Sequence, residues 1–345
     1  MSDLAAPVRY QDRSTGLILV GILAICLALL CLLVLVFTGI TAVSAKALAP
    51  QVDSRSLAAS GLFYLALAVF FGTMGIGTLR GRRWARTLML VTSWIWLITG
   101  VFSTVVLIFI LPKMTAGLTG AGGAGADAAT GAVVMGCVSI VLGLFYLVLP
   151  GGLLLFYRGP NVRATFEAKD PNVPWTDRVP SPVLALTLML AFGAVSSLTA
   201  TAYGVLPVFN TLLKGTPAVL AFLAIGVICA LLAWGTYHQR PAAWWTMLVL
   251  WLLGCINSAV FLKTGGPSLR DMYVAMGTPP TQMEQIDRLG IYDLFTNPLI
   301  LSLMVVLWLG WLGFLIWVKR FFPGKGGAYS PLRGCEGIAD QGLSS

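Results

Sequence analysis

Four arginines within seven residues form the densest group of charged side chains in this chain, Arg80-Gly-Arg-Arg-Trp-Ala-Arg86. Guanidinium groups bind phosphate through planar, paired N–H donors, so such a cluster can hold the headgroup of an anionic lipid. The cluster lies between two long apolar runs, where basic residues also serve topology alone. We assign Arg80, Arg82, Arg83 and Arg86 as candidate lipid-headgroup ligands, with the purely topological role as the alternative.

His238 is the only histidine, and it lies at the end of an apolar run, next to Arg240. One histidine excludes a bis-histidine haem within this chain and a Ser-His-Asp triad inside the membrane. His238 remains a weak candidate for a single axial ligand to a haem or pigment, and the alternative is an interfacial residue in a turn. The cysteine spacings match no zinc or haem-attachment pattern, so we expect no cofactor and no metal.

Two features inside apolar runs could bind a solute or pack helices. Gly193, Ser197 and Thr201 recur at every fourth residue, which gives a ridge of small side chains along one helix. Such ridges let two backbones approach closely, and the alternative is that the ridge lines a solute path. Asn257 is the most polar side chain deep in any run. Because an unpaired amide in lipid is costly, it should bond a neighbouring helix or line a cavity.

These residues must be positioned by helices in a membrane. Each of eight apolar runs is long enough to cross the hydrocarbon core as a helix, and none of the 22 basic and 13 acidic residues falls within them. We predict an all-α integral membrane protein with these eight spans: Thr15–Ile40, Leu57–Leu79, Thr87–Pro112, Gly131–Tyr157, Pro182–Leu206, Ala218–Tyr237, Ala242–Leu262 and Pro298–Val318. The absence of intramembrane charge removes the usual mark of proton or ion transport.

The basic residues predict the orientation of the chain. With both termini on one side, that side holds fifteen of the 22 Lys and Arg residues and the other side holds seven. Because Lys and Arg are retained on the cytoplasmic side, we expect both termini in the cytoplasm and a multi-pass protein of a bacterial-type inner (cytoplasmic) membrane. The positive face should attract anionic lipids, whereas nucleic-acid binding would require a folded basic domain that no loop is large enough to form.

An internal similarity predicts two related halves. Tyr64–Val91 aligns without gaps on Phe222–Val249 at an offset of 158 residues, and both segments contain Gly-Thr followed four residues later by Arg. Four spans in each half give both halves the same polarity in the membrane, which makes this a parallel repeat. We divide the chain into a first four-helix half (1–157), a proline-rich cytoplasmic linker (158–181), a second four-helix half (182–322) and a disordered cytoplasmic tail (323–345).

The two halves differ most in the loop between their third and fourth spans. In the first half, Lys113–Thr130 is rich in Gly and Ala and is predicted to be flexible. In the second half, Lys263–Asn297 predicts two short amphipathic helices on the outer membrane surface, the second opened by Thr281 and Glu284 at capping-box spacing. Proline in the linker should end the preceding helix, and Pro150 should bend or end the fourth span.

No Walker A loop, metalloprotease helix, nucleophile elbow or dinucleotide fingerprint is present in the sequence. We therefore expect a non-catalytic membrane subunit or scaffold that packs against a membrane-protein partner, a second copy of itself, or lipids. The alternative is a permease or channel for an uncharged or lipid-like solute, with its path between the two halves near Asn257. A lipid-modifying enzyme ranks last, because the sequence offers no acid–base constellation.

Overall fold

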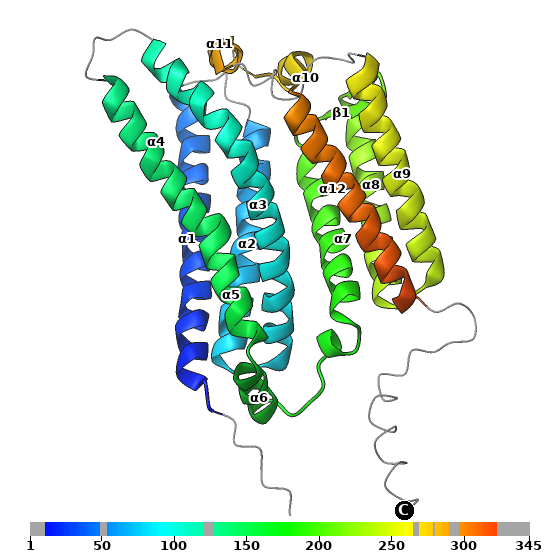
Figure 1. Ribbon diagram of the computed structural model, residues 1–345. Helices are drawn as coiled ribbons and strands as arrows, with labels where there is room; N and C mark the ends of the chain where they lie inside the picture. The colour runs from blue at the N-terminus through cyan, green and yellow to red at the C-terminus, as the bar shows by residue number, and fades with distance from the viewer. Residues whose placement is uncertain are drawn as a thin grey trace, which may run out of the picture.

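The computed structural model describes residues 11–48, 54–120, 127–264, 269–278, 280–289 and 297–322. Within these ranges, eight helices are long and apolar enough to cross a membrane, which confirms the predicted all-α membrane class and the number of spans. They run side by side with their ends at two opposite faces of the molecule (Figure 1). α1 begins and α12 ends at the same face, as an even number of crossings requires.

The first half consists of α1 (Ser14–Leu48), α2 (Ser54–Leu79), α3 (Arg83–Gly120) and a composite fourth span. In that span α4 (Asp127–Gly143) passes through a π-helical turn at Leu144–Val148 into α5 (Leu149–Arg158). Pro150 accounts for the π-helical turn, because proline has no N–H to offer the carbonyl of Tyr146 and its ring clashes with that carbonyl in an α-helix. Pro150, which was expected to bend or end the fourth span, thus interrupts its α-helical hydrogen bonding.

The second half consists of α7 (Ser181–Ala200), α8 (Thr216–Tyr237), α9 (Pro241–Thr264) and α12 (Pro298–Val318), which a 3₁₀ turn (Lys319–Phe321) follows. The two groups of four stand next to each other, and α7 contacts α2 and α3 of the first half (Figure 1). The ring of Phe63 in α2 meets that of Phe192 in α7 edge to face, with 6.0 Å between centroids.

Glycine brings the first two helices of each half together. A Cβ added at Gly75 of α2 would lie 2.9 Å from the carbonyl oxygen of Gly21 in α1, and one added at Gly226 of α8 would lie 3.4 Å from that of Ala194 in α7. Small residues let the two backbones approach closely. The resulting van der Waals packing favours helix association in lipid, where the hydrophobic effect does not drive it.

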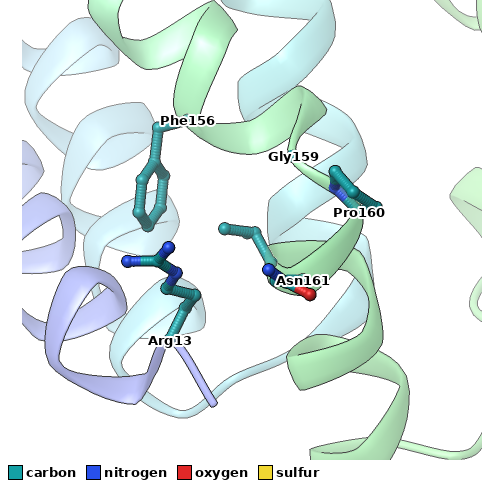
Figure 2. A pocket seen from close by; sticks show the side chains of 6 residues that line it. Arg13, Phe156, Gly159, Pro160 and Asn161 are labelled. Atoms are coloured by element: carbon teal, nitrogen blue, oxygen red, sulfur yellow. The ribbon is translucent and has the colours of Figure 1, made fainter. Parts of the chain in front are cut away.

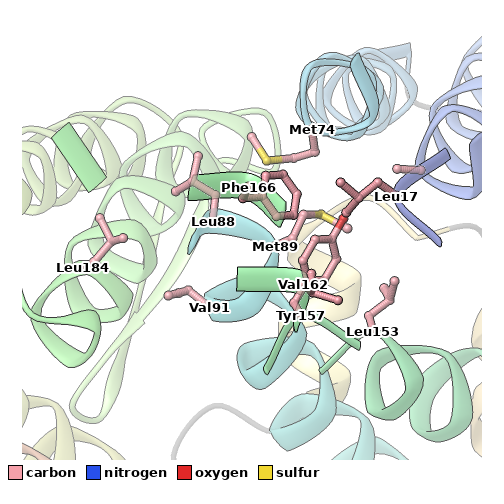
Figure 3. Close-up of a cluster of buried hydrophobic side chains, with 11 residues drawn as sticks. Leu17, Met74, Leu88, Met89, Val91, Leu153, Tyr157, Val162, Phe166 and Leu184 are labelled. Atoms are coloured by element: carbon pink, nitrogen blue, oxygen red, sulfur yellow. The ribbon is translucent and has the colours of Figure 1, made fainter. Parts of the chain in front are cut away.

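Each half has its own cluster of buried side chains, which packs its helices together. The first joins α1, α2, α3 and α5 through residues such as Leu17, Met74, Met89 and Tyr157, and reaches Leu184 of α7 (Figure 3). The second joins α7, α8, α9 and α12 through Leu186, Leu232, Met247 and Leu315. In the second cluster the indole N–H of Trp244 donates to the carbonyl of Leu315 at 2.9 Å, which ties α9 to α12.

The turns that connect the second and third spans of each half have the same backbone geometry. The amide of Arg82 donates to Gly77 and that of Gly81 to Thr78; in the other turn Arg240 donates to Gly235 and Gln239 to Thr236, all at 2.9 Å. Gly81 and Gln239 both have positive φ, 64° and 53°. The helices that flank the turns also end and begin at the offset of 158 residues.

The predicted fifth span is wrong at its end. It was expected to reach Leu206, but α7 ends at Ala200 and the chain forms an antiparallel hairpin, β1 (Val205–Val208) and β2 (Thr211–Lys214). Gly204 and Gly215 close the base of the hairpin, with a hydrogen bond of 2.8 Å between them and positive φ at both. Glycine adopts that conformation without steric cost, so these two residues redirect an apolar segment that hydropathy alone assigns to the helix.

The linker is more structured than its proline content predicted. α5 does end at Arg158, as expected, but Pro160 then occupies the first position of a new helix, α6 (Pro160–Lys169), where its missing N–H costs nothing. A 3₁₀ turn follows at Trp175–Asp177. α6 packs beneath the first half, with Phe166 fully buried and its ring 6.2 Å from that of Tyr157.

At the opposite face lie the two short helices expected in the last long loop, α10 (Leu269–Ala275) and α11 (Pro280–Leu289) (Figure 1). Met283 on the predicted apolar face of α11 is buried. The side chain of Thr281, residues 121–126 and the tail 323–345 lie outside the described part of the chain. α3 extends beyond the predicted limit at Pro112 to Gly120, so the loop after it is shorter than expected.

Candidate functional site

The arginine cluster lies in the turn between α2 and α3, above the linker. The guanidinium of Arg83 is 3.3 Å from the carboxylate of Asp177 and 3.8 Å from that of Glu167. Its backbone N–H, the first of α3, donates to Asp170 at 3.4 Å. Arg82 pairs with the same Asp170 at 3.8 Å. Three acidic residues of the linker thus neutralise two of the four predicted headgroup ligands.

Asp177 has a second contact with α3. It accepts a hydrogen bond of 2.6 Å from the hydroxyl of Thr87, one turn beyond Arg83. Carboxylates at the beginning of a helix are favourable, because the N–H groups there carry partial positive charge. The linker therefore caps α3 through side chains that are close to ninety residues away in sequence.

Glu167 connects this network to α6. It accepts a hydrogen bond of 2.8 Å from Arg163, one turn earlier on the same helix. That bond, together with the charges of Arg163, Arg83 and Arg86, holds the pKa of Glu167 below its ordinary value, against the opposing effect of burial. The carboxylate is thus retained as an anion among three cations. Sequence reasoning missed this pairing, although acidic residues in the linker beside a basic turn were a visible signal.

Arg86 differs from its neighbours. Its Nε is buried and has no hydrogen-bond partner within the described residues. Arg80 has no ion pair within that part of the chain. The sequence prediction of a headgroup site over Arg80, Arg82, Arg83 and Arg86 therefore rests on a group whose members are unequally available.

His238 follows α8 and is exposed. Its Nδ1 lies 2.8 Å from the carbonyl oxygen of Trp234, and its ring contacts Trp234 and Tyr237 at centroid distances of 4.8 and 5.4 Å. His238 thus lies in the turn between α8 and α9, with one ring nitrogen next to a carbonyl of its own helix. The described residues contain no group of three or more His, Cys, Asp or Glu side chains placed to hold a metal ion.

Asn257 lies on α9, opposite the turn of the hairpin. Its side-chain oxygen accepts a hydrogen bond from the backbone N–H of Phe209, a non-glycine residue with φ of 51°. Asn257 was expected to bond a neighbouring helix or to line a cavity, and its partner is instead the hairpin, which the sequence did not predict. A cavity of about 370 Å³ opens nearby between the base of the hairpin and α10, lined by Tyr203, Gly204, Gly215 and Met276 among others. Asn257 does not line it.

The ridge on α7 faces α8 within the same half. A Cβ at Gly193 would lie 3.7 Å from the Sγ of Cys229, and one at Gly226 would lie 3.6 Å from the Cβ of Ser197. The hydroxyl of Ser197 donates to the carbonyl of Gly193, and that of Thr201 to Leu198. Both hydroxyls are satisfied along their own helix.

A second, shallow cavity of about 280 Å³ lies at the face of α6, between the beginning of α1 and the end of α5. Figure 2 shows the Arg13 side chain directed toward the ring of Phe156, with Gly159, Pro160 and Asn161 on the other side. The backbone N–H of Arg13 donates to the hydroxyl of Thr165 at 3.2 Å, which fixes α1 to α6.

Comparison of this chain with protein-family models, with curated proteins and with solved structures finds no match in any of the three. The contacts described above are therefore the basis for the function proposed below. They have one property in common: each polar side chain named as a candidate, where it has a partner, holds two segments of the chain together or bonds its own helix.

Proposed function

We propose that this chain is a non-catalytic membrane protein with a structural or accessory role, which packs against a partner protein, a second copy of itself, or lipids. The observation that supports this most is that arginines of the charged cluster are paired with acidic residues of the linker. Arg83, the least exposed of the paired arginines, binds Glu167 and Asp177 through its guanidinium and Asp170 through its backbone N–H. A catalytic or transport site needs polar groups that converge on a substrate, and these converge on one another.

The outward faces of the helices fit this role. Large apolar side chains remain exposed along the second half, among them Leu231 of α8, Leu253 of α9, and Val306 and Leu309 of α12. In a membrane these faces meet lipid tails or another protein. Packing against a partner would use α9 and α12, because α7 and α8 already contact each other and α7 contacts the first half.

The proposed architecture is a pair of parallel four-helix halves in the inner membrane, with both termini in the cytoplasm. The turns at Gly81 and Gln239 both end a helix in a Schellman motif, which many helices share. The repeat is therefore supported mainly by the common offset of 158 residues and by Gly-Thr followed four residues later by Arg in both turns. The basic turns, the linker, the beginning of α1 and the end of α12 lie at one face, which supports the orientation.

A permease for an uncharged or lipid-like solute is the second candidate. The cavity between the hairpin and α10 supports it, because this cavity lies at the face opposite the linker, where a solute would enter. The contacts of Gly193 and Ser197 speak against a path along their ridge, since that ridge is filled by α8 of the same half.

The experiment is to purify the tagged full-length chain from its native membrane in nanodiscs, with the untagged strain as the control. Mass spectrometry and an absorption spectrum are then recorded on the same fraction. A stoichiometric membrane protein, or a self-associated species, supports the accessory role. A solitary, monomeric chain contradicts packing against a partner protein or a second copy. Solute flux in vesicles that is present in the wild type and absent in Asn257→Leu would establish the permease instead.

A further inference from the structure

The basic residues of the second half have a different environment from those of the first. Arg240 follows α8, and Lys319 and Arg320 follow α12, at the face that also carries the linker. None of the three has an ion pair within the described residues, and the described segments 216–264 and 298–322 contain no Asp or Glu. The linker acids are bound to the other half.

These cations rest on tryptophan rings. The guanidinium of Arg240 lies 4.1 Å from the ring centroid of Trp234, and that of Arg320 lies 4.2 Å from Trp317. The ammonium of Lys319 lies 5.0 Å from both Trp244 and Trp245. A ring face attracts a cation but, unlike a carboxylate, does not cancel its charge, so the outer side of each cation is left to bind an anion.

The indoles also set the depth of this surface. Trp234, Trp245 and Trp317 are about half exposed, and tryptophan prefers the level of the lipid headgroups. Three cations are thus held by their aromatic supports at the level where phosphates of phospholipids lie. Positive-inside topology explains where such residues occur, but it requires neither the rings nor the absence of acids.

We propose that Arg240, Lys319 and Arg320, with Trp234, Trp244, Trp245 and Trp317, form a binding surface for the phosphate of anionic phospholipids on the second half. Arg82 and Arg83 of the first half then serve mainly to fix the linker. This surface is independent of whether the chain has a protein partner, so failure of the accessory role leaves it standing.

The test is native mass spectrometry of the detergent-solubilised full chain, titrated with phosphatidylglycerol and, in parallel, with phosphatidylcholine of the same acyl chains. The triple variant R240Q/K319Q/R320Q should bind phosphatidylglycerol much more weakly, by about fivefold for each charge removed, because one cation near an anionic surface contributes on the order of 1 kcal/mol. Phosphatidylcholine binding should not change. The charge-preserving variant R240K/K319R/R320K should retain most of the affinity.

The matched control is R80Q/R82Q/R158Q, which removes three charges from the same face of the first half. Its fold-loss of affinity for phosphatidylglycerol should be less than a fifth of the fold-loss in the second-half variant. Equal losses in both variants would show a general charge effect and overturn the proposal, and a larger loss in the control would place the site in the first half. If R240Q/K319Q/R320Q does not fold, the three single variants replace it, and unchanged binding in all three is equally contradictory.

Discussion

The hydroxyl groups of Thr78 and Tyr157 lie 2.9 Å apart, buried where α2 and α5 end. Thr236, at the equivalent turn of the second half, is also fully buried, but its hydroxyl has no hydrogen-bond partner among the residues that the structure describes. The buried residues near the end of α12, Leu315 and Val318, carry no hydroxyl to offer. The two turns therefore have the same backbone hydrogen bonds, but only the first has a side-chain hydrogen bond from its threonine.

Replacing Tyr157 by Phe should destabilise the protein by about 1–2 kcal/mol, because it leaves the Thr78 hydroxyl buried and unpaired. Thr236→Val is the matched control: it removes a hydroxyl that is already unpaired, so stability should stay the same or rise. Thermal unfolding of the two variants in the same detergent measures both effects. A Thr236→Val variant as unstable as Tyr157→Phe would mean that Thr236 has a partner.

Gly100→Ala should be strongly destabilising, by roughly 3 kcal/mol or more, because overpacking against backbone cannot be relieved by rotating a side chain. The added Cβ would lie 2.0 Å from the carbonyl oxygen of Tyr146. Gly143→Ala, one residue before the π-helical turn, has open space around it and should be neutral or slightly stabilising. Equal behaviour of both variants on unfolding would contradict the close approach of α3 to the π-helical turn.

Stability should fall on acidification in part through Glu167. Its folded pKa lies below the ordinary value of 4.5, so the anion stabilises the fold above that pH, and the contribution disappears as the pH falls through the lowered pKa. Glu167→Gln should therefore show a smaller drop in melting temperature between about pH 6 and about pH 3 than the wild type. Identical drops in the two proteins would show that the contacts with Arg163 and Arg83 do not lower the pKa of Glu167 in the folded protein.

Asn257→Leu should loosen the hairpin. The variant leaves the N–H of Phe209 without its acceptor, so exchange of that amide should accelerate by about tenfold, the equivalent of one hydrogen bond. Asn257→Asp keeps an oxygen at the same place and should exchange like the wild type. Hydrogen–deuterium exchange of the hairpin peptide provides the measurement, and equal exchange in the Leu and Asp variants would remove Asn257 from this role.

The spans were predictable because charge is costly in lipid, and one rule, the absence of charged residues, locates all eight. The same rule failed at Leu206, since β1 is as apolar as the helix before it and only Gly204 and Gly215 mark the change. The short helices α10 and α11 were predictable from local caps and periodicity. α6 was not predicted, because Pro160 was interpreted as a residue that ends a helix and not as one that begins the next.

The candidate site was less predictable than the fold. The arginine cluster was found from density alone, but its partners Asp170 and Asp177 approach only when the linker folds back beneath α3. Nothing in the spacing of the residues specifies that return. Likewise Asn257 was recognised as a polar group that needs a partner, while its partner depended on a hairpin that hydropathy concealed.

The position of the linker acids in the chain has a consequence for biosynthesis. During translation, Arg80, Arg82 and Arg83 emerge long before Asp170 and Asp177, so for that interval they are unpaired at the membrane surface. In the proposed orientation they retain their full charge while the insertion machinery sets the direction of the first spans. Only when Asp170 and Asp177 have been made can the linker pair with Arg82 and Arg83. The same arginines thus act twice, first as a signal that orients the nascent chain and later as part of its finished structure.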